Sequence, residues 1–544
     1  MDYFFAGLII LSIAGFFYAV GHYKKARRLK KIRQKWEGVY EDKDMPTSAE
    51  LLFVLKGDAT GTQSYSLDDA TWHDLDLDDL FAILNRTSTP IGAQYLYYLL
   101  RTPALHCDVL QAREKLINHF LQNHELREKI QLIFESYKNR NMSYLPSLLW
   151  ERLPEIPSYA RFLPLFSAAA VIIPILVAFQ FLHISSILIV FIVNMLIHYS
   201  VRKKITVFIS PFAQLHLLYK IVKKIYLLKD EVLSDIQAEM RDDSMVVLKI
   251  AKILSAFQMK GPGEELNEYV QIYFLAESTS FYTALKRIDG QLKNWRRLHE
   301  NVGKLDALIS IACFRHNAAQ YCQPVFCDKH EGFSVEGVAH PLIDNAVENS
   351  FCFAPRTNII TGSNMSGKTT FLKTIGVNTV LAQTFNMCIA EKYEAPFIRI
   401  MSSIGRSDNL ITGTSYYLAE VESLLRIINA SKSPEIYLFL ADEIFRGTNS
   451  VERLAASIAV LEYLANDKDF ALVATHDLEL TTELSSQYKN YHFREQVDEA
   501  GLSFDYTLYA GPSKTKNAIA LLGYAGYPDE LVQNANRRTR GNVK

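Results

Sequence analysis

Residues 362–369 read Gly-Ser-Asn-Met-Ser-Gly-Lys-Thr, which fits the pattern G-x-x-x-x-G-K-[ST] of a phosphate-binding loop. A short β-branched run before the loop predicts a buried strand, and apolar residues at helical spacing follow it. In that setting backbone N–H groups and a helix N-terminus close on phosphate oxygens. The lysine is expected to reach the β- and γ-phosphates of ATP, and the threonine to hold Mg²⁺. The predicted nucleotide-binding residues are Gly362, Ser363, Asn364, Met365, Ser366, Gly367, Lys368, Thr369 and Thr370.

Two later apolar runs also end in polar residues. The first, 436–441, leads into Asp442 and Glu443, and the second, 471–475, leads into His476. A strand that delivers an aspartate beside a phosphate loop can hold the Mg²⁺ shell, so Asp442 is predicted to join Thr369 as a metal ligand. Glu443 is predicted to accept a proton from the attacking water, and His476 to contact the γ-phosphate or that water. The alternatives are two solvated acids at a strand end and a structural histidine. The order of these groups after a phosphate loop favours a site, with Lys368 as the third catalytic residue.

A hydroxyl-rich stretch, Gly413-Thr414-Ser415, lies between these strands and precedes an apolar helix. A helix start of this composition is a second device for binding anions. Because the phosphate loop is already complete, Ser415 is predicted to contact a nucleotide held by a partner.

Bulk composition narrows the remaining possibilities. With 544 residues the chain has room for about three or four domains. The net charge of −1 gives no global basic field that would point to nucleic acid. Its six cysteines form no paired framework, which fits a reducing compartment. Cysteines and histidines gather between residues 313 and 330, but their spacing matches no zinc pattern, and a packing cluster is the favoured interpretation.

The N-terminal residues predict a membrane anchor. Tyr3 to Val20 is an unbroken run of eighteen apolar or small residues, just long enough to span a bilayer. Lysines and arginines follow this run between residues 24 and 35, whereas Asp2 precedes it. This order predicts an uncleaved anchor over 1–36 with its N-terminus outside and the chain continuing in the cytoplasm. A nucleic-acid patch is the alternative for the basic cluster, but the flank of an anchor accounts for it.

A second apolar stretch, 162–199, contains no Asp, Glu, Lys or Arg. It is too long for one span and fits two short ones, broken near Gln180 to His183. Basic residues stand at both ends, Arg161 before it and 202–204 after it, which predicts a transmembrane hairpin with cytoplasmic ends. The alternative is a buried helical hairpin in a soluble core, which so long an uncharged stretch disfavours.

Helical patterns dominate the middle of the chain. From 78 to 120 the apolar residues recur at helical spacing, interrupted at residues 87–92. Pro90 suits the first turn of a helix, and Thr89 is a candidate cap. Helical signals return from 205 to 322. These stripes predict a scaffold and no site of their own.

Taken together, the C-terminal motifs resemble the MutS family, whose nucleotide domain is related to ABC ATPases. The family's phosphate loop reads G-P-N-M-G-G-K-S-T, and here it is GSNMSGKTT. Its metal strand and loop read M-D-E-I-G-R-G-T-S, and here residues 441–450 are ADEIFRGTNS. Its later A-T-H-Y-x-E-L strand corresponds to ATHDLEL at 474–480. Upstream, 84–93 resembles the start of the family's helical lever domain, and 305–308 resembles its return helix.

The resemblance implies an α/β ABC-type P-loop ATPase domain over 330–544, ending in a helical dimerisation tail. It also implies a mostly α-helical lever domain over 50–325, interrupted by the transmembrane hairpin. It implies a homodimer with two composite ATP sites, in which Ser415 and Asn449 would act on the partner's nucleotide. The cofactors would be ATP and Mg²⁺, and DNA would be the partner.

The resemblance is incomplete, because the family's N-terminal mismatch-reading and connector domains have no counterpart and an anchor takes their place. We therefore expect a membrane-anchored ATPase that closes a dimeric clamp on DNA, with the lever and ATPase domains in the cytoplasm and three helices in the inner membrane. The alternatives are a transporter-associated ABC-type ATPase and a membrane scaffold with an ATP switch. Few spans and the lack of an LSGGQ-type sequence count against the transporter.

Overall fold

A computed structural model of the chain describes residues 2–38, 48–60, 65–137, 142–255, 264–328, 332–363, 365–405, 416–498, 501–513 and 526–541. The chain forms two compact units. The first comprises residues 1–63, 84–98 and 115–317, and the second comprises 64–83, 99–114 and 318–544. Three helices, α4 (Leu77–Leu84), α5 (Pro90–Arg101) and α6 (Cys107–Gln122), are divided between the units, and α4 has only Leu84 in the first.

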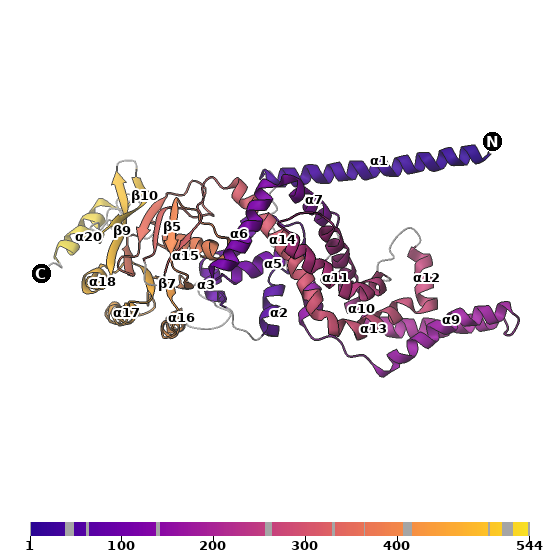
Figure 1. The fold of residues 1–544 in the computed structure, drawn as a ribbon. Helices are drawn as coiled ribbons and strands as arrows, with labels where there is room; N and C mark the ends of the chain where they lie inside the picture. Colours follow the sequence, from indigo (N-terminus) through magenta and orange to yellow (C-terminus); the bar gives the residue numbers. More distant parts are fainter. Residues whose placement is uncertain are drawn as a thin grey trace. The chain divides into compact units, whose positions relative to one another are not determined.

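The first unit is helical (Figure 1). Its longest helix, α10, packs along α11, and α11 packs on α14, so that apolar faces at helical spacing bury one another. The helices of this unit are α1 (Asp2–Trp36), α2 (Leu51–Thr60), α7 (His124–Glu135), α8 (Leu145–Trp150), η1 (Ser158–Phe162), α9 (Leu163–Ala178), α10 (Ser185–Tyr226), α11 (Ser234–Leu254), α12 (Glu264–Phe274), α13 (Ala276–Ile288), η3 (Asp289–Gln291) and α14 (Leu292–Asn317).

The predicted cap of α5 is confirmed. The helix begins at Pro90, and the Thr89 hydroxyl accepts a hydrogen bond from Gly92 N at 3.0 Å. A buried carboxylate on α14, Asp306, accepts bonds from Ser88 N at 3.0 Å, from Thr89 N at 2.8 Å and from the Thr89 hydroxyl at 2.7 Å. Burial raises the pKa of Asp306 to about 6, and these hydrogen bonds oppose the rise. The turn before α5 is therefore fastened to α14.

Gly92→Ala is expected to loosen this fastening. A Cβ at position 92 would lie 2.3 Å from Asp306 Oδ2 and 2.6 Å from Cγ, so the carboxylate would have to move off its donors. We expect the free energy of unfolding to fall by about 2–4 kcal/mol, from overpacking and lost buried hydrogen bonds. Urea unfolding of the solubilised protein measures it. Gly57→Ala is the control, because that helical glycine has open space around it and should gain up to about 1 kcal/mol. Equal losses in both variants would contradict the assignment.

The apolar stretch forms a helical hairpin. Helix α9 ends at Ala178 and α10 begins at Ser185, so the predicted break between Gln180 and His183 is confirmed. Two helical stretches among the described residues, Ser158–Ala178 and Ser185–Tyr226, are long and apolar enough to cross a membrane. Large apolar side chains are exposed along both arms: Phe162, Leu165, Phe166, Val171, Ile172, Ile175, Phe179, Phe181, Leu182, Ile184, Leu188, Ile189, Ile192, Val193, Leu196 and Tyr199.

The third predicted span, Tyr3 to Val20, lies on α1. Most side chains of its first half lie outside the described residues, and no such stretch is found on the described part of α1. The N-terminal span therefore stays a prediction.

The second unit contains two sheets. The larger has the strand order β10-β9-β4-β8-β7-β6, in which only β10 runs antiparallel to its neighbour. Every residue of β4 and β8 is buried, as expected for central parallel strands. The strands of this sheet are β4 (Thr357–Thr361), β6 (Arg399–Ser403), β7 (Tyr437–Asp442), β8 (Phe470–Thr475), β9 (Lys489–Asp498) and β10 (Gly501–Ala510). The smaller, mixed sheet has the order β1-β5-β2-β3, with β1 (Val325–Phe326), β2 (Ser334–Val338), β3 (Asn349–Cys352) and β5 (Lys392–Ala395).

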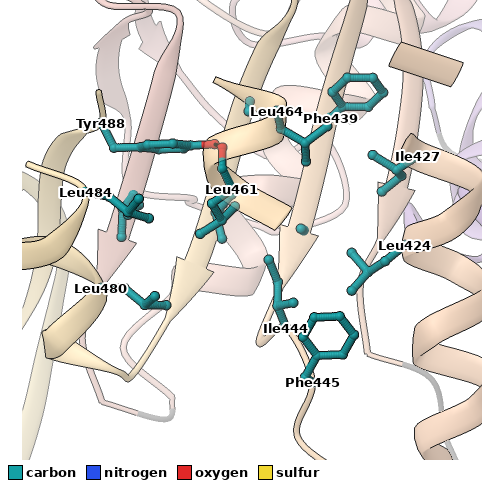
Figure 2. Close-up of a cluster of buried hydrophobic side chains, with 14 of the residues drawn as sticks. Leu424, Ile427, Phe439, Ile444, Phe445, Leu461, Leu464, Leu480, Leu484 and Tyr488 are labelled. Atoms are coloured by element: carbon teal, nitrogen blue, oxygen red, sulfur yellow. Dashed lines mark hydrogen bonds between the residues drawn. The ribbon is translucent and has the colours of Figure 1, made fainter. Parts of the chain in front are cut away.

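Helices pack around the larger sheet, and one of its two faces is covered by a dense apolar cluster (Figure 2). Side chains from α16, β7, α17, β8 and α18 meet there, and the Tyr488 hydroxyl donates to Leu461 O at 2.8 Å. The helices of the unit are α3 (Asp69–Asp74), α4 (Leu77–Leu84), α15 (Lys368–Phe385), α16 (Tyr416–Ser431), α17 (Ser450–Leu464), α18 (Leu478–Glu483) and α20 (Asp529–Gly541). The predicted C-terminal tail is thus helical over α20, while residues 514–525 lie outside the described part.

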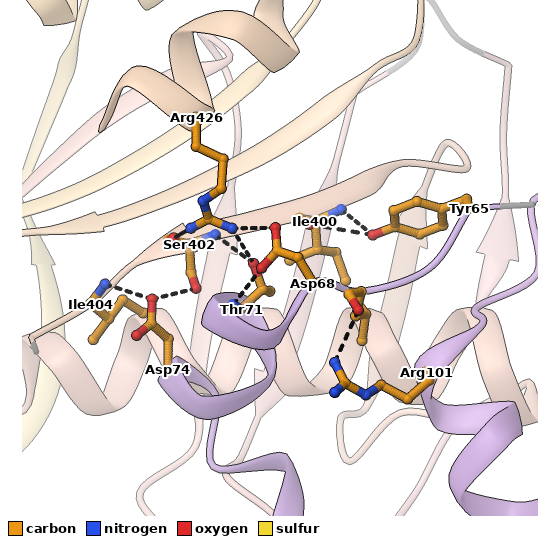
Figure 3. A network of polar contacts seen from close by, with 10 residues as sticks. Tyr65, Asp68, Thr71, Asp74, Arg101, Ile400, Ser402, Ile404 and Arg426 are labelled. Atoms are coloured by element: carbon orange, nitrogen blue, oxygen red, sulfur yellow. Dashed lines mark hydrogen bonds and ion pairs between the residues drawn. The ribbon is translucent and has the colours of Figure 1, made fainter. Parts of the chain in front are cut away.

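The division into units differs from the predicted ranges of 50–325 and 330–544, because residues 64–83 and 99–114 belong to the unit that contains the two sheets. The α3 segment is fastened to β6 by a polar network (Figure 3). Asp74 Oδ2 accepts from the Ser402 hydroxyl at 2.7 Å and from Ile404 N at 2.9 Å. Arg426 bonds both Asp68 and Ser402 O. Local patterns could not reveal the contacts of Asp68 and Asp74, since their partners lie more than 300 residues away in the sequence.

Candidate nucleotide site

Strand register brings the predicted polar residues to one edge of the larger sheet. Thr361, the last residue of β4, pairs with Thr475, the last residue of β8. On the other side of β8, Asp442 pairs with Ala474. The phosphate loop, His476 and Glu443 each follow directly after these strand ends. Three segments far apart in sequence therefore converge at the carboxyl edge, where parallel sheets usually bind ligands.

The backbone of the phosphate loop has positive φ values at its two glycines, a conformation that glycine adopts without strain. Gly362 has a φ of 152° and Gly367 a φ of 105°, and Gly367 caps the N-terminus of α15. Met365 also has a positive φ, 76°, and an exposed side chain. Lys368 Nζ donates to Gly362 O at 2.7 Å and Ser363 O at 2.9 Å, so the ammonium lies inside the loop. Burial lowers the pKa of Lys368, and the nearby carboxylates oppose this. Asn364 lies outside the described residues.

The two predicted metal ligands touch. The Thr369 hydroxyl donates to Asp442 Oδ2 at 2.6 Å. Asp442 Oδ1 is buried and has no hydrogen-bond partner among the described residues. Burial raises the pKa of Asp442, which a cation would reverse. Mg²⁺ is usually coordinated by one or two protein oxygens together with phosphate oxygens and water. Here a hydroxyl and a carboxylate with an oxygen free of hydrogen bonds to described residues lie next to the phosphate loop. The residues present therefore fit this metal.

Glu443 and His476 form a second contact beside the first. Glu443 is buried, in the left-handed region with a φ of 54°, and its Oε2 contacts His476 Nδ1. The hydrogen bond with Glu443 raises the pKa of His476, whose side chain is 49% exposed. Arg446 Nη2 lies 3.8 Å from Glu443 Oε1, a neighbour that sequence reasoning missed. A strained, buried carboxylate held between two cationic groups is typical of an active site.

A pocket of about 500 Å³ opens beside the loop and was not predicted. It lies between the loop, with Thr370 on its wall, and the segment 343–347. Burial lowers the pKa of His340 to about 4, so this wall of the pocket carries a neutral imidazole. Tyr506 enters from β10 at a register shift between Phe504 and Leu508. Largely apolar walls with a few polar groups suit a flat heterocyclic base.

The two residues predicted to act on a partner's nucleotide are not tested. Ser415 lies outside the described residues. Asn449 is exposed and caps α17, its Oδ1 accepting from Val451 N at 3.1 Å and from Glu452 N at 3.0 Å. No group of three or more potential metal-binding His, Cys, Asp or Glu side chains occurs in the described part of the chain.

Comparison with known proteins assigns the chain to a family. The family model for MutS domain V matches residues 358–541, and that for MutS domain III matches residues 66–312. A DNA mismatch repair protein MutS of Natronomonas pharaonis is 32% identical over 253 residues, which are 44% of this chain and 29% of that protein. The MutS proteins of Thermus thermophilus and Thermus aquaticus are 29% and 30% identical over 284 residues, 51% of this chain and 34% of theirs. The chain thus spans about a third of the length of these relatives. Two matched domains in the order of the family, around the site described above, show that this chain is a member of the MutS family.

Proposed function

We propose that the chain is a Mg²⁺-dependent ATPase. The observation that carries the proposal is the pair of contacts at one sheet edge, Thr369 with Asp442 and Glu443 with His476. The first pair offers metal ligands and the second a base, and the ammonium of Lys368 lies inside the neighbouring phosphate loop. Family membership supports the same reaction, transfer of the γ-phosphoryl group of ATP to water.

Each residue has a distinct task in this reaction. The loop N–H groups and Lys368 bind the phosphates, and Lys368 exchanges its two carbonyl acceptors for phosphate oxygens. Thr369 and Asp442 would hold Mg²⁺, which neutralises charge on the phosphates when bound. Glu443 orients a water and takes its proton, while His476 and Arg446 fix the carboxylate. The pocket lined by His340 and Tyr506 holds the base and so sets the position of the chain of phosphates.

His476→Gln is expected to change the pH dependence of hydrolysis. In the wild type, His476 gains a proton at a pH above its ordinary value of 6.5. The imidazolium then pairs with Glu443 and weakens it as a base, so the rate falls as the pH drops through that raised pKa. In the variant no group titrates at position 476, and the decline moves to lower pH. The plateau rate should fall by about 10²-fold, as when one charge-stabilising donor is removed. An unchanged acid limb would contradict the role of His476.

We further propose that ATP drives closure of a homodimer on DNA. The support is family membership, the match to MutS domain III and the similarity to DNA mismatch repair proteins MutS. Each ATP site would be completed by Ser415 and Asn449 of the second copy. The test is a binding panel of linear, mismatched and branched DNA with ATP, ADP or no nucleotide. Binding through phosphates should weaken steeply with salt. Failure to bind any of these at low salt would overturn the DNA part and leave the ATPase intact.

The membrane part of the proposal rests on the hairpin. Its arms expose large apolar side chains to their surroundings, as a lipid-facing surface requires. With Tyr3 to Val20 it would anchor the protein in the inner membrane, and both units would lie in the cytoplasm. Extraction of cell membranes with alkaline carbonate tests this, because an inserted hairpin stays in the pellet. A soluble full-length protein would rule the anchor out.

A further inference from the structure

A groove of about 790 Å³ runs along the base of the hairpin, between η1, α9 and α10. One wall is formed by Phe162, the last residue of η1, and by Leu165, Phe166 and Ala169 on α9, which recur at helical spacing. The opposite wall consists of α10 residues Leu196, Ile197, Ser200, Val201 and Lys204. The groove belongs to neither the nucleotide site nor the apolar core.

The groove is polar at one end and apolar at the other. Tyr159, Ser200 and Lys204 lie at the end next to the basic flank of the hairpin, and Ala169 and Leu196 lie toward the hairpin tip. Ser200 and Lys204 are four residues apart on α10, so both side chains face the same way. From Phe162 to Ala169 the wall is about 10 Å long.

Lys204 is held at the polar end. Its Nζ lies 5.0 Å from the centre of the Tyr159 ring, and the Tyr159 hydroxyl is fixed by the Tyr282 hydroxyl at 3.0 Å. A second cation, Arg161, stacks on the Phe162 ring at 4.8 Å, beside the same opening. No described acid forms an ion pair with either cation, whereas Arg202, two residues before Lys204 on α10, is paired with Glu268. The positive charge at the groove is thus available to an anion.

We propose that this groove binds an anionic phospholipid of the cytoplasmic leaflet, with the headgroup phosphate at Lys204 and one acyl chain lying toward Ala169 and Leu196. A lipid in that leaflet has its phosphate at the cytoplasmic end and its chain toward the membrane interior, which is the polarity of the groove. Basic residues near a membrane surface attract anionic lipids. The inference rests on the proposed insertion of the hairpin and adds a specific ligand to it.

The test uses the full-length protein, reconstituted with phosphatidylcholine alone or mixed with phosphatidylglycerol and then analysed by native mass spectrometry in detergent. The wild type is expected to retain phosphatidylglycerol selectively. Ala169→Trp and Ser200→Phe, which fill the groove from opposite walls, are expected to lower retention by about tenfold. Lys204→Gln should lower it by about fivefold, the contribution of one basic residue near a membrane. Glycerol 3-phosphate, which has the phosphate without a chain, should not compete.

Matched controls are available beside each variant. Ala168→Trp places the same indole on α9 outside the groove, and Lys203→Gln removes a neighbouring exposed cation that does not line it. Neither should change retention. Equal retention of both lipids, or equal losses in Ala168→Trp and Ala169→Trp, would overturn the lipid site. Vesicle flotation of the same proteins separates the two ideas, because a protein that floats without lipid selectivity keeps its hairpin and loses only this site. A protein that does not float overturns both.

Discussion

Glu443→Gln is expected to bind ATP with nearly wild-type affinity and to hydrolyse it about 10²- to 10⁴-fold more slowly, the usual contribution of a positioned general base. The amide keeps the size of the carboxylate but cannot accept the proton of the attacking water. Glu443 is buried and its main-chain N–H donates to Ala474 O at 2.9 Å, so the backbone that positions it does not depend on the charge. Single-turnover hydrolysis and equilibrium binding of a fluorescent ATP analogue measure the two effects separately.

Glu462→Gln is the matched control, since that exposed glutamate lies on α17 and contacts nothing in the site. It should hydrolyse ATP at the wild-type rate. If Glu443→Gln also kept that rate, Glu443 would not be the base. The slow variant has a second use, because it would accumulate the ATP-bound state for the DNA-binding panel.

Lys368→Ala is expected to lose at least about 10²-fold in ATP affinity. Its two hydrogen bonds to loop carbonyls would be replaced by charge-assisted bonds to phosphate, each contributing about 1.5–3 kcal/mol. The fold should not suffer. Because burial lowers the pKa of Lys368, the ammonium is poorly solvated in the folded state, and its removal should leave the melting temperature equal or higher. Isothermal titration calorimetry and thermal unfolding without nucleotide test both statements.

Lys373→Ala is the control for Lys368→Ala. It shows whether the loss of ATP affinity is specific to the lysine of the phosphate loop or follows from removing any lysine on α15. Lys373 Nζ bonds Asp76 Oδ2 at 2.5 Å and does not touch the phosphate loop. We expect this variant to bind ATP normally. An equal loss of affinity in both variants would show that the effect comes from α15 as a whole.

The sequence predicted those parts of the site that depend on local patterns. The phosphate loop, Asp442, Glu443 and His476 each follow an apolar run, and parallel pairing necessarily collects such strand ends at one edge. The cap at Thr89 and the break in the hairpin were likewise local. In both cases the relevant partners lie within a few residues of each other.

The other features of the site, the pocket residue Tyr506 and the position of Arg446, depend on contacts that cannot be read from the residues adjacent in the sequence. Tyr506 reaches the base pocket because β10 shifts register there, and Asn349 from β3 holds the shift by donating to Tyr506 O at 3.0 Å and accepting from Leu508 N at 2.7 Å. From the sequence alone, Arg446 looks like an ordinary positively charged residue in a loop. Its role follows only from the left-handed turn at Glu443, which brings the guanidinium back toward the carboxylate.

The three-segment origin of the second unit limits how this unit can be isolated. A fragment of residues 318–544 would keep every proposed catalytic side chain. It would lose Asp68, which accepts a hydrogen bond from Arg426, and Asp74, which accepts hydrogen bonds at the end of β6. It would also lose Leu75, whose Cδ2 lies 2.6 Å from where a Cβ on Gly376 would be. Such a fragment would expose the surface of α15 that Leu75 covers, and it would also expose the unpaired edge of β6. An exposed strand edge is a template for aggregation. The smallest autonomous form of this unit must therefore carry residues 64–114, supplied upstream in the same chain or as a separate peptide.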